Sequence, residues 1–284
     1  MQIVHTQEEV RQAVRQWRSE GLSVGLVPTM GYLHEGHQSL IRKSVEDNDR
    51  TVVSVFVNPM QFGAGEDLES YPRDMEKDAA LCEETGADIV FNPTPEEMYP
   101  EGFCTYVDMN GLTTNLCGKT RPTHFRGVMT VVSKLFNMTT PDRAYFGWKD
   151  AQQLCVVKRM ARDLSMGLEI VGCPIIREED GLAKSSRNTY LNDEERKAAL
   201  ILSKTLALGK KMLDEGERNP EVLLSAMKKN IETEPLARID YVQAVDLDRV
   251  EDVKEIKGEV LVAMAVYIGK TRLIDNFVYK YPEE

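Results

Sequence analysis

The sequence lacks the features that define several protein classes. Its five cysteines are odd in number and include no C-x-x-C pair, which argues against a disulfide framework or a zinc ribbon. The longest strongly apolar run, residues 260–268, is too short to span a bilayer, and the first residues run straight into charged ones. We therefore expect a protein of the reducing cytoplasm with no membrane partner.

An excess of basic residues is also missing. Lysine and arginine total 35 against 46 aspartates and glutamates, which gives a net charge of −11. Because binding to a phosphate backbone usually needs a basic face, we expect no nucleic-acid partner. A local group of amides, histidines and lysines can still bind a small anion. On its own, the acidity is better explained by a role in solubility.

Neither an internal repeat nor a low-complexity tract is present in the 284 residues. Apolar residues make up 42% of the chain and charged residues 29%, which is typical of a globular protein. At roughly 100–200 residues per domain, this length favours two domains.

Strand and helix patterns alternate through the first part of the chain. Thr6 and Glu9 form a capping box before a first amphipathic helix, which Gly21 ends. Strands are expected at 22–27, 51–57, 88–91, 143–146 and 168–176, and further helices after residue 36 and at 72–86, 127–138 and 150–164. This alternation predicts a doubly wound, Rossmann-like parallel α/β domain.

The pattern changes after Gly181. Two long helices are expected at 193–213 and 220–233, followed by strands at 239–245, 260–268 and 273–278. We interpret this part as a smaller α+β domain. The predicted division is a catalytic domain at 1–176 and a lid domain at 177–284.

The most informative motif lies between the strand at 22–27 and the helix that follows it. Ligands of open α/β sheets bind at this carboxyl edge. Gly31 and Gly36 allow the backbone to approach a phosphate, the helix N-terminus supplies N–H donors, and His34 and His37 are three residues apart. The histidines are also compatible with a capping role or part of a metal site. The loop is neither a Walker A sequence nor a G-x-G-x-x-G fingerprint.

Three other segments carry polar residues in similar positions. Gln61 follows a predicted strand, where its amide can bind hydroxyls or a carboxylate, although the segment also fits a simple turn. Lys149 and Asp150 follow another strand, and Asp150 suits either a ribose contact or a helix N-cap. Residues 184–187 form a basic and polar loop at the domain junction, which fits a lid or a solvated turn.

These segments resemble known families. His34-Glu35-Gly36-His37 is similar to the H-x-G-H signature of the nucleotidylyltransferase superfamily, which class I aminoacyl-tRNA synthetases share. Five blocks together, residues 28–37, 57–62, 121–125, 146–150 and 185–188, resemble the pantothenate synthetase (pantoate:β-alanine ligase) family in order and spacing over nearly the whole chain.

The resemblance implies a ligase reaction. ATP and (R)-pantoate would give pantoyl adenylate and pyrophosphate, and β-alanine would then attack to give AMP and pantothenate, a coenzyme A precursor. Mg²⁺ is expected as the partner of ATP, and the family suggests a homodimer.

The resemblance also implies roles for individual residues. His37, His34 and Lys149 are expected to be catalytic, with His37 the best candidate for proton donation, and Gln61 and Gln153 are expected to bind substrate. Trp148 and Lys184 depart from the residues that the family usually has. Contacts with ATP are expected from Met30, Gly31, Tyr32, Leu33, His34, Glu35, Gly36, His37, Gly147, Trp148, Lys149, Asp150, Ile176, Lys184, Ser185, Ser186 and Arg187.

Three alternatives remain open at this point. A cytidylyl- or adenylyltransferase would use the same signature with a phosphorylated acceptor and stop after one step. The acidic balance and the short second domain disfavour an aminoacyl-tRNA synthetase. A nucleotide-sensing regulator would bind ATP without turnover.

Overall fold

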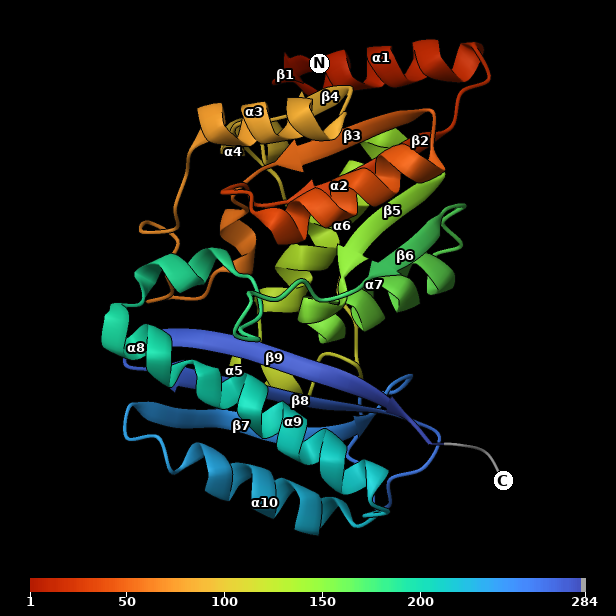
Figure 1. Cartoon of the computed structure of the whole chain (residues 1–284). Helices are drawn as coiled ribbons and strands as arrows, with labels where there is room; N and C mark the ends of the chain where they lie inside the picture. Colours follow the sequence, from red (N-terminus) through yellow and green to blue (C-terminus); the bar gives the residue numbers. More distant parts are fainter. Residues whose placement is uncertain (282–284) are drawn as a thin grey trace. The chain divides into compact units, whose positions relative to one another are not determined.

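A computed structural model describes residues 1–281. Contacts divide the chain into two compact units, which Figure 1 shows coloured along the sequence. Unit 1 comprises Met1–Met109, Thr123–Trp148 and Val156–Pro174, and unit 2 comprises Asn110–Pro122, Lys149–Cys155 and the chain from Ile175 on. Unit 2 thus includes two short segments that precede residue 176, whereas a single division of the chain after that residue would assign them to the first domain.

Unit 1 is built on a six-stranded sheet, and all its strand pairs are parallel. The spatial order β1-β4-β3-β2-β5-β6 reverses direction next to β2, as in a doubly wound fold. This confirms the predicted Rossmann-like domain. The strands are β1 (Gln2–Val4), β2 (Val24–Thr29), β3 (Arg50–Val55), β4 (Ile89–Phe91), β5 (Arg143–Gly147) and β6 (Glu169–Cys173).

Helices cover both faces of this sheet. Figure 1 shows α2 and α3 in front of the sheet and α6 behind it, and α1 packs against α6. Fully buried side chains such as Ile41 on α2 and Val53 on β3 form the core beneath the front helices. The helices are α1 (Gln7–Ser19), α2 (Glu35–Asp47), α3 (Met75–Thr85), α4 (Pro95–Met98), α6 (His124–Thr139) and α7 (Ala151–Asp163), with the 3-10 turn η1 at Pro59–Gln61; α7 begins in unit 2.

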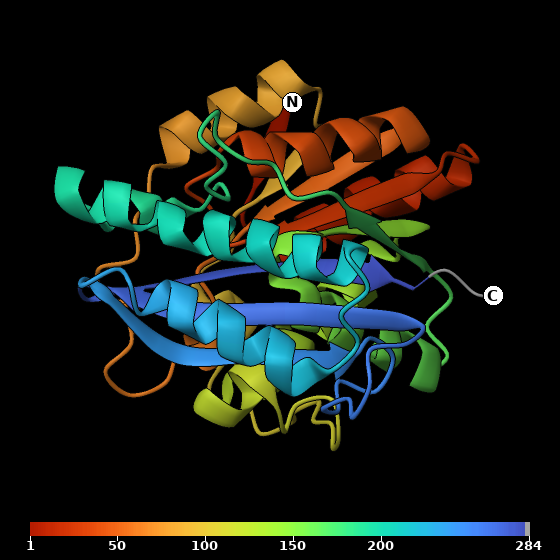
Figure 2. The ribbon, with the colours of Figure 1, turned by 60° about the horizontal axis from the view of Figure 1, so that its bottom comes forward.

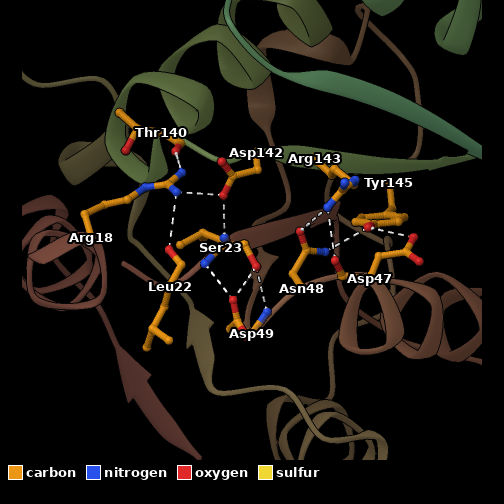
Figure 3. Close-up of polar contacts among 11 residues, drawn as sticks. Arg18, Leu22, Ser23, Asp47, Asn48, Asp49, Thr140, Asp142, Arg143 and Tyr145 are labelled. Carbon is orange, nitrogen blue, oxygen red and sulfur yellow. Dashed lines mark hydrogen bonds and ion pairs between the residues drawn. The ribbon is translucent and has the colours of Figure 1, made fainter. Parts of the chain in front are cut away.

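Side-chain carboxylates hold the amino-terminal edge of the sheet (Figure 3). Asp142 accepts the N–H of Val24 at 2.7 Å and pairs with Arg18 at 2.7 Å. Asp49 accepts both the N–H and the hydroxyl of Ser23, at 2.9 and 2.6 Å. These bonds fix where β2 begins, and they leave the carboxyl edge of the sheet to the polar loops.

Unit 2 contains an antiparallel sheet in the order β7-β8-β9, with α9 and α10 side by side on one face (Figure 2). This confirms the predicted α+β architecture. The elements are α5 (Leu116–Thr120), η3 (Ser186–Tyr190), α8 (Asp193–Ala198), α9 (Leu200–Asp214), α10 (Pro220–Ile231), β7 (Ala237–Asp246), β8 (Glu259–Ile268) and β9 (Thr271–Lys280), and η2 (Trp148–Asp150) lies at the boundary of the two units.

Two helix predictions need correction. The helix expected at 193–213 is divided at Ala199 into α8 and α9, although neither glycine nor proline marks the break. The helix expected from residue 72 begins at Met75, because the Asp74 side chain accepts the N–H of Lys77 and caps the helix there. No helix within residues 1–281 is both long and apolar enough to cross a membrane.

Candidate functional site

The two signature histidines cap the helix that follows β2. His34 is the N-cap of α2, and its Nδ1 accepts the N–H of Gly36 at 3.1 Å. In return, Nδ1 of His37 accepts the N–H of His34 at 3.3 Å. The ring centroids are 4.1 Å apart. The motif is therefore a capping box in which both side-chain positions are imidazoles.

This capping arrangement defines the tautomer of both rings. A ring nitrogen that accepts an N–H carries no proton, so each neutral imidazole has its proton on Nε2. The sequence predicted that backbone N–H groups at the start of this helix would be donors to a ligand. In the structure, the N–H of Gly36 binds His34 Nδ1 and the N–H of His37 binds the carbonyl of His34 at 2.8 Å. With both Nδ1 atoms accepting N–H bonds, Nε2 is the ring atom from which each neutral imidazole can donate.

A buried carboxylate supports the turn just before these histidines. Gly31 and Tyr32 have left-handed backbone conformations, with φ of 83° and 51°. Asp78, which lies on α3 and is fully buried, accepts the N–H of Tyr32 at 2.7 Å and that of Leu33 at 2.6 Å. Burial raises the pKa of Asp78, although the two backbone donors act to lower it. Sequence reasoning missed this residue.

A second network holds Gln61 at the end of β3. The fully buried Asn58 donates from Nδ2 to Oε1 of Gln61 at 3.1 Å, and Tyr99 donates its hydroxyl to Oδ1 of Asn58 at 2.8 Å. Gln61 Nε2 lies 2.8 Å from the sulfur of Met30, in the loop after β2. The structure thus brings together the predicted residues Met30 and Gln61. Asn58 was not predicted, although its place directly after a strand was a usable signal.

A third histidine lies beside this network. His124, the first residue of α6, places Nδ1 2.9 Å from the backbone carbonyl of Gln61, although the two residues are far apart in sequence.

Among the described residues, no group of three or more His, Cys, Asp or Glu side chains is placed to hold a metal ion.

In unit 2, the segment after β5 is attached to strand β9. Asn276 of β9 donates from Nδ2 to the carbonyl of Lys149 at 2.9 Å, and the Lys149 ammonium lies 3.9 Å from Asp150. The neighbouring Asp275 pairs with Arg177 through two bonds of 2.7 and 2.9 Å. Two consecutive β9 residues therefore fix the Lys149 segment and the chain that follows Ile176.

Two adjacent glutamines at the start of α7 have different environments. Gln152 is buried and binds the N–H of Cys117 at 2.9 Å and the carbonyls of Leu112 and Asn115 at 2.8 Å. Gln153 is only partly buried. The structure gives Gln152 a structural role, so Gln153 remains the candidate for a substrate contact.

The predicted loop of residues 184–187 continues a short hairpin. Lys184 donates its N–H to the carbonyl of Ile176 at 2.9 Å, and Gly181 turns the chain with φ of 93°. Ser185 then caps η3, because its Oγ accepts the N–H of Arg187 at 3.3 Å. The structure thus joins Ile176, Lys184, Ser185 and Arg187 in one local unit.

Glu178 connects this hairpin to its surroundings. Its two oxygens accept bonds from Asn188 at 3.0 Å and from Arg196 at 2.6 Å. Arg196 also pairs with Asp180 at 2.8 Å. Burial acts to lower the pKa of Arg196, but its bonds to the two carboxylates outweigh this effect and raise it. The hairpin and η3 are therefore held by charge-assisted hydrogen bonds.

Comparisons with known proteins agree over nearly the whole chain. The family model for pantoate-beta-alanine ligase matches residues 2–278. A pantothenate synthetase of Ruminiclostridium cellulolyticum is 65% identical over 279 residues, which cover 98% of this chain and 99% of the relative. One of Enterococcus faecalis is 59% identical over 280 residues, 99% of each chain.

Solved structures give the same result. A pantothenate synthetase of Thermus thermophilus has a TM-score of 0.93 and 45% identity, covering 98% of this chain and 99% of that one. A pantoate-beta-alanine ligase of Francisella tularensis, complexed with beta-gamma ATP and β-alanine, has a TM-score of 0.80 and 32% identity, covering 98% and 97%.

Proposed function

The chain belongs to the pantoate-beta-alanine ligase family, and we propose that it uses ATP to join (R)-pantoate to β-alanine, giving pantothenate, AMP and pyrophosphate. Family membership supports the overall reaction. The structural observation that carries the proposal is the pair of imidazoles at the start of α2, both held in the tautomer that donates from Nε2.

The proposed reaction has two steps. A carboxylate oxygen of pantoate attacks the α-phosphorus of ATP, the bond to the bridging oxygen breaks, and pyrophosphate leaves. The amine of β-alanine then attacks the acyl carbon of pantoyl adenylate, loses a proton and displaces AMP. Because the pantoate carboxylate is already a nucleophile, catalysis depends on positioning and on stabilising charge at phosphorus.

From unit 1, we propose that His34 and His37 donate Nε2–H bonds to phosphate oxygens, with His37 the better candidate for proton donation. The helix dipole of α2 supports negative charge at this end. Gln61 orients pantoate and β-alanine, and its anchoring by Asn58 favours a fixed amide orientation. The turn residues Met30 to Leu33 and Glu35 and Gly36 complete the proposed nucleotide contacts.

From unit 2, we propose that Lys149, Ser185, Ser186 and Arg187 hold the triphosphate and that Gln153 orients pantoate. Gly147 and Trp148 of unit 1, and Asp150, Ile176 and Lys184 of unit 2, complete the proposed ATP contacts. The same proposal makes residues 1–176 the catalytic domain and 177–284 a lid that keeps water from the acyl adenylate.

Mg²⁺ is part of this proposal as the partner of ATP. No described residues form a cluster of three or more metal ligands of the His, Cys, Asp or Glu type. Mg²⁺ that binds together with a nucleotide keeps phosphate and water ligands and takes few ligands from the protein. When bound, the ion would neutralise charge on the phosphates.

We also propose that the protein is a cytoplasmic homodimer. The scattered cysteines support the cytoplasmic assignment, and the family resemblance supports the homodimer. Light scattering of the purified chain should give twice the mass of 32.1 kDa, and a monomer would contradict it.

Exchange of labelled pyrophosphate into ATP tests the proposed chemistry. We expect exchange with ATP, (R)-pantoate and Mg²⁺ in the absence of β-alanine, because the first step is reversible and releases pyrophosphate. Adding β-alanine should convert the adenylate to pantothenate and AMP. Formation of ADP in proportion to product, or exchange without pantoate, would contradict the adenylate mechanism.

A further inference from the structure

We propose that Asp78 is a positioning residue for the histidine pair: its carboxylate holds the turn at residues 31–33 and thereby sets the orientation of the His34 and His37 rings. The inference rests on the proposed function for its kinetic consequence. It adds a residue from α3 that contacts neither imidazole in the described hydrogen bonds and acts through the backbone between them and β2.

The first observation is the geometry of the turn. Gly31 and Tyr32 both have positive φ, and a left-handed conformation is unfavourable for a side chain such as that of tyrosine. Successive amides in such a turn point to one side and form a concave anion site. Here the anion is the protein's own carboxylate, with one oxygen on the N–H of Tyr32 and the other on the N–H of Leu33.

The second observation is the absence of space around this contact. A Cβ at Gly31 would lie 2.9 Å from Val55 and 3.0 Å from Oδ2 of Asp78. Asp78 and Leu33 are buried, at 0% and 1% exposure. The carboxylate and the turn are therefore packed closely against each other.

The third observation is the short connection from this turn to the rings. Leu33 precedes His34, whose N–H binds Nδ1 of His37 and whose Nδ1 binds the N–H of Gly36. A change in the backbone at Leu33 therefore reorients the N–H of His34 and disturbs the capping box. Because that capping box keeps both rings in the Nε2–H form, Asp78 acts on the tautomer as well as on ring position.

Asp78→Asn is the decisive substitution. It preserves shape, but its amide has only one oxygen for two N–H donors, so an NH₂ group faces one of them. Asp142→Asn is the matched control, because Asp142 also accepts a backbone N–H beside β2, that of Val24, but at the amino-terminal end of the strand. Both variants lose one carboxylate at an end of β2, and only one borders the histidine turn.

Two measurements separate positioning from general destabilisation. The chain has four histidines, so ring ¹⁵N spectra can be assigned with single histidine variants. We expect Asp78→Asn to lose the unprotonated Nδ1 signature of His34 and His37, and Asp142→Asn to retain it. With a ring displaced by about 1 Å, kcat for pantothenate formation should fall about 10²-fold in Asp78→Asn, and the control should stay within about threefold.

The outcomes are distinct. Native ring spectra in folded Asp78→Asn would overturn the inference, whatever its activity. If the native chain forms no pantothenate, the proposed function fails, while the spectra still decide the role of Asp78. If Asp78→Asn does not fold, Gly31→Ala takes its place, since its Cβ presses on Val55 and Asp78 from within the turn. Native spectra and kcat in folded Gly31→Ala would then overturn the inference.

Discussion

Two single substitutions, His34→Asn and His37→Gln, should each remove one imidazole while leaving α2 capped. Asparagine is among the best N-cap residues, and glutamine at the third helical position can return a bond to the N-cap N–H. The histidines make these same two bonds from Nδ1. Both variants therefore keep the hydrogen bonds of the turn and lose only the Nε2–H donors.

The expected magnitudes differ for stability and for rate. His34→Ala should lower the free energy of unfolding by about 1 kcal/mol, because it leaves the N–H of Gly36 without its cap. For a domain of 150–250 residues, a loss of about 1 kcal/mol lowers Tm by only about 2–4 °C. Loss of one donor to the phosphates should lower kcat by about 10²- to 10³-fold in every variant of either histidine.

Thermal denaturation followed by circular dichroism, together with steady-state kinetics, tests both parts. His34→Asn should be as stable as the native chain and as inactive as His34→Ala, and His37→Gln should behave in the same way. Turnover within a fewfold of native in His34→Asn and His37→Gln would refute the donor role. Equal stability of His34→Ala and His34→Asn would refute the capping role.

Two further predictions concern parts of the molecule outside the histidine turn. Burial acts to raise the pKa of Asp142, but the N–H of Val24 and the Arg18 guanidinium outweigh it and lower the pKa. Because its pKa is lower in the folded chain, the Asp142 carboxylate stabilises the fold above its unfolded pKa of about 3.9. In urea titrations, Asp142→Asn should therefore be less stable than the native chain at pH 7, by about 1 kcal/mol for a partly exposed bond, and the difference should shrink below pH 4; a constant difference would contradict this. Glu178→Gln should raise KM for ATP about tenfold, because it weakens the bonds to Asn188 and Arg196 that hold the 184–187 loop. The exposed Asp180→Asn should raise KM less, and equal KM values in both variants would count against the loop's assigned role.

Much of the fold could be predicted because its signals are local. The capping box of Thr6 and Glu9 lies within one helical turn and is present in the structure. Buried strands such as β8 form continuous apolar runs, which mark them in the sequence. β1 has only three residues, Gln2–Val4, and is a strand because it pairs with β4. So short a pattern carries too little periodicity to be recognised.

The supporting residues of the candidate site depend on tertiary contacts. His34 and His37 were recognisable because they lie three positions apart in the sequence. Asp78 lies 45 positions from Leu33, and its function depends on α3 packing beside the turn. In the sequence it is one acidic residue among many on a helix. The same holds for His124, which reaches Gln61 only in the folded chain.

The histidine capping box links the chemical state of the rings to the first turn of α2. Helix ends open locally at lower free energy than whole domains do. When that turn opens, the N–H partners of both Nδ1 atoms are lost, and each ring is free to exchange its tautomer. The population of the donor-competent rings is then a local folding equilibrium, separate from that of the rest of the chain. Mild heat or denaturant should therefore lower the catalytic activity while the circular dichroism spectrum still shows an intact fold.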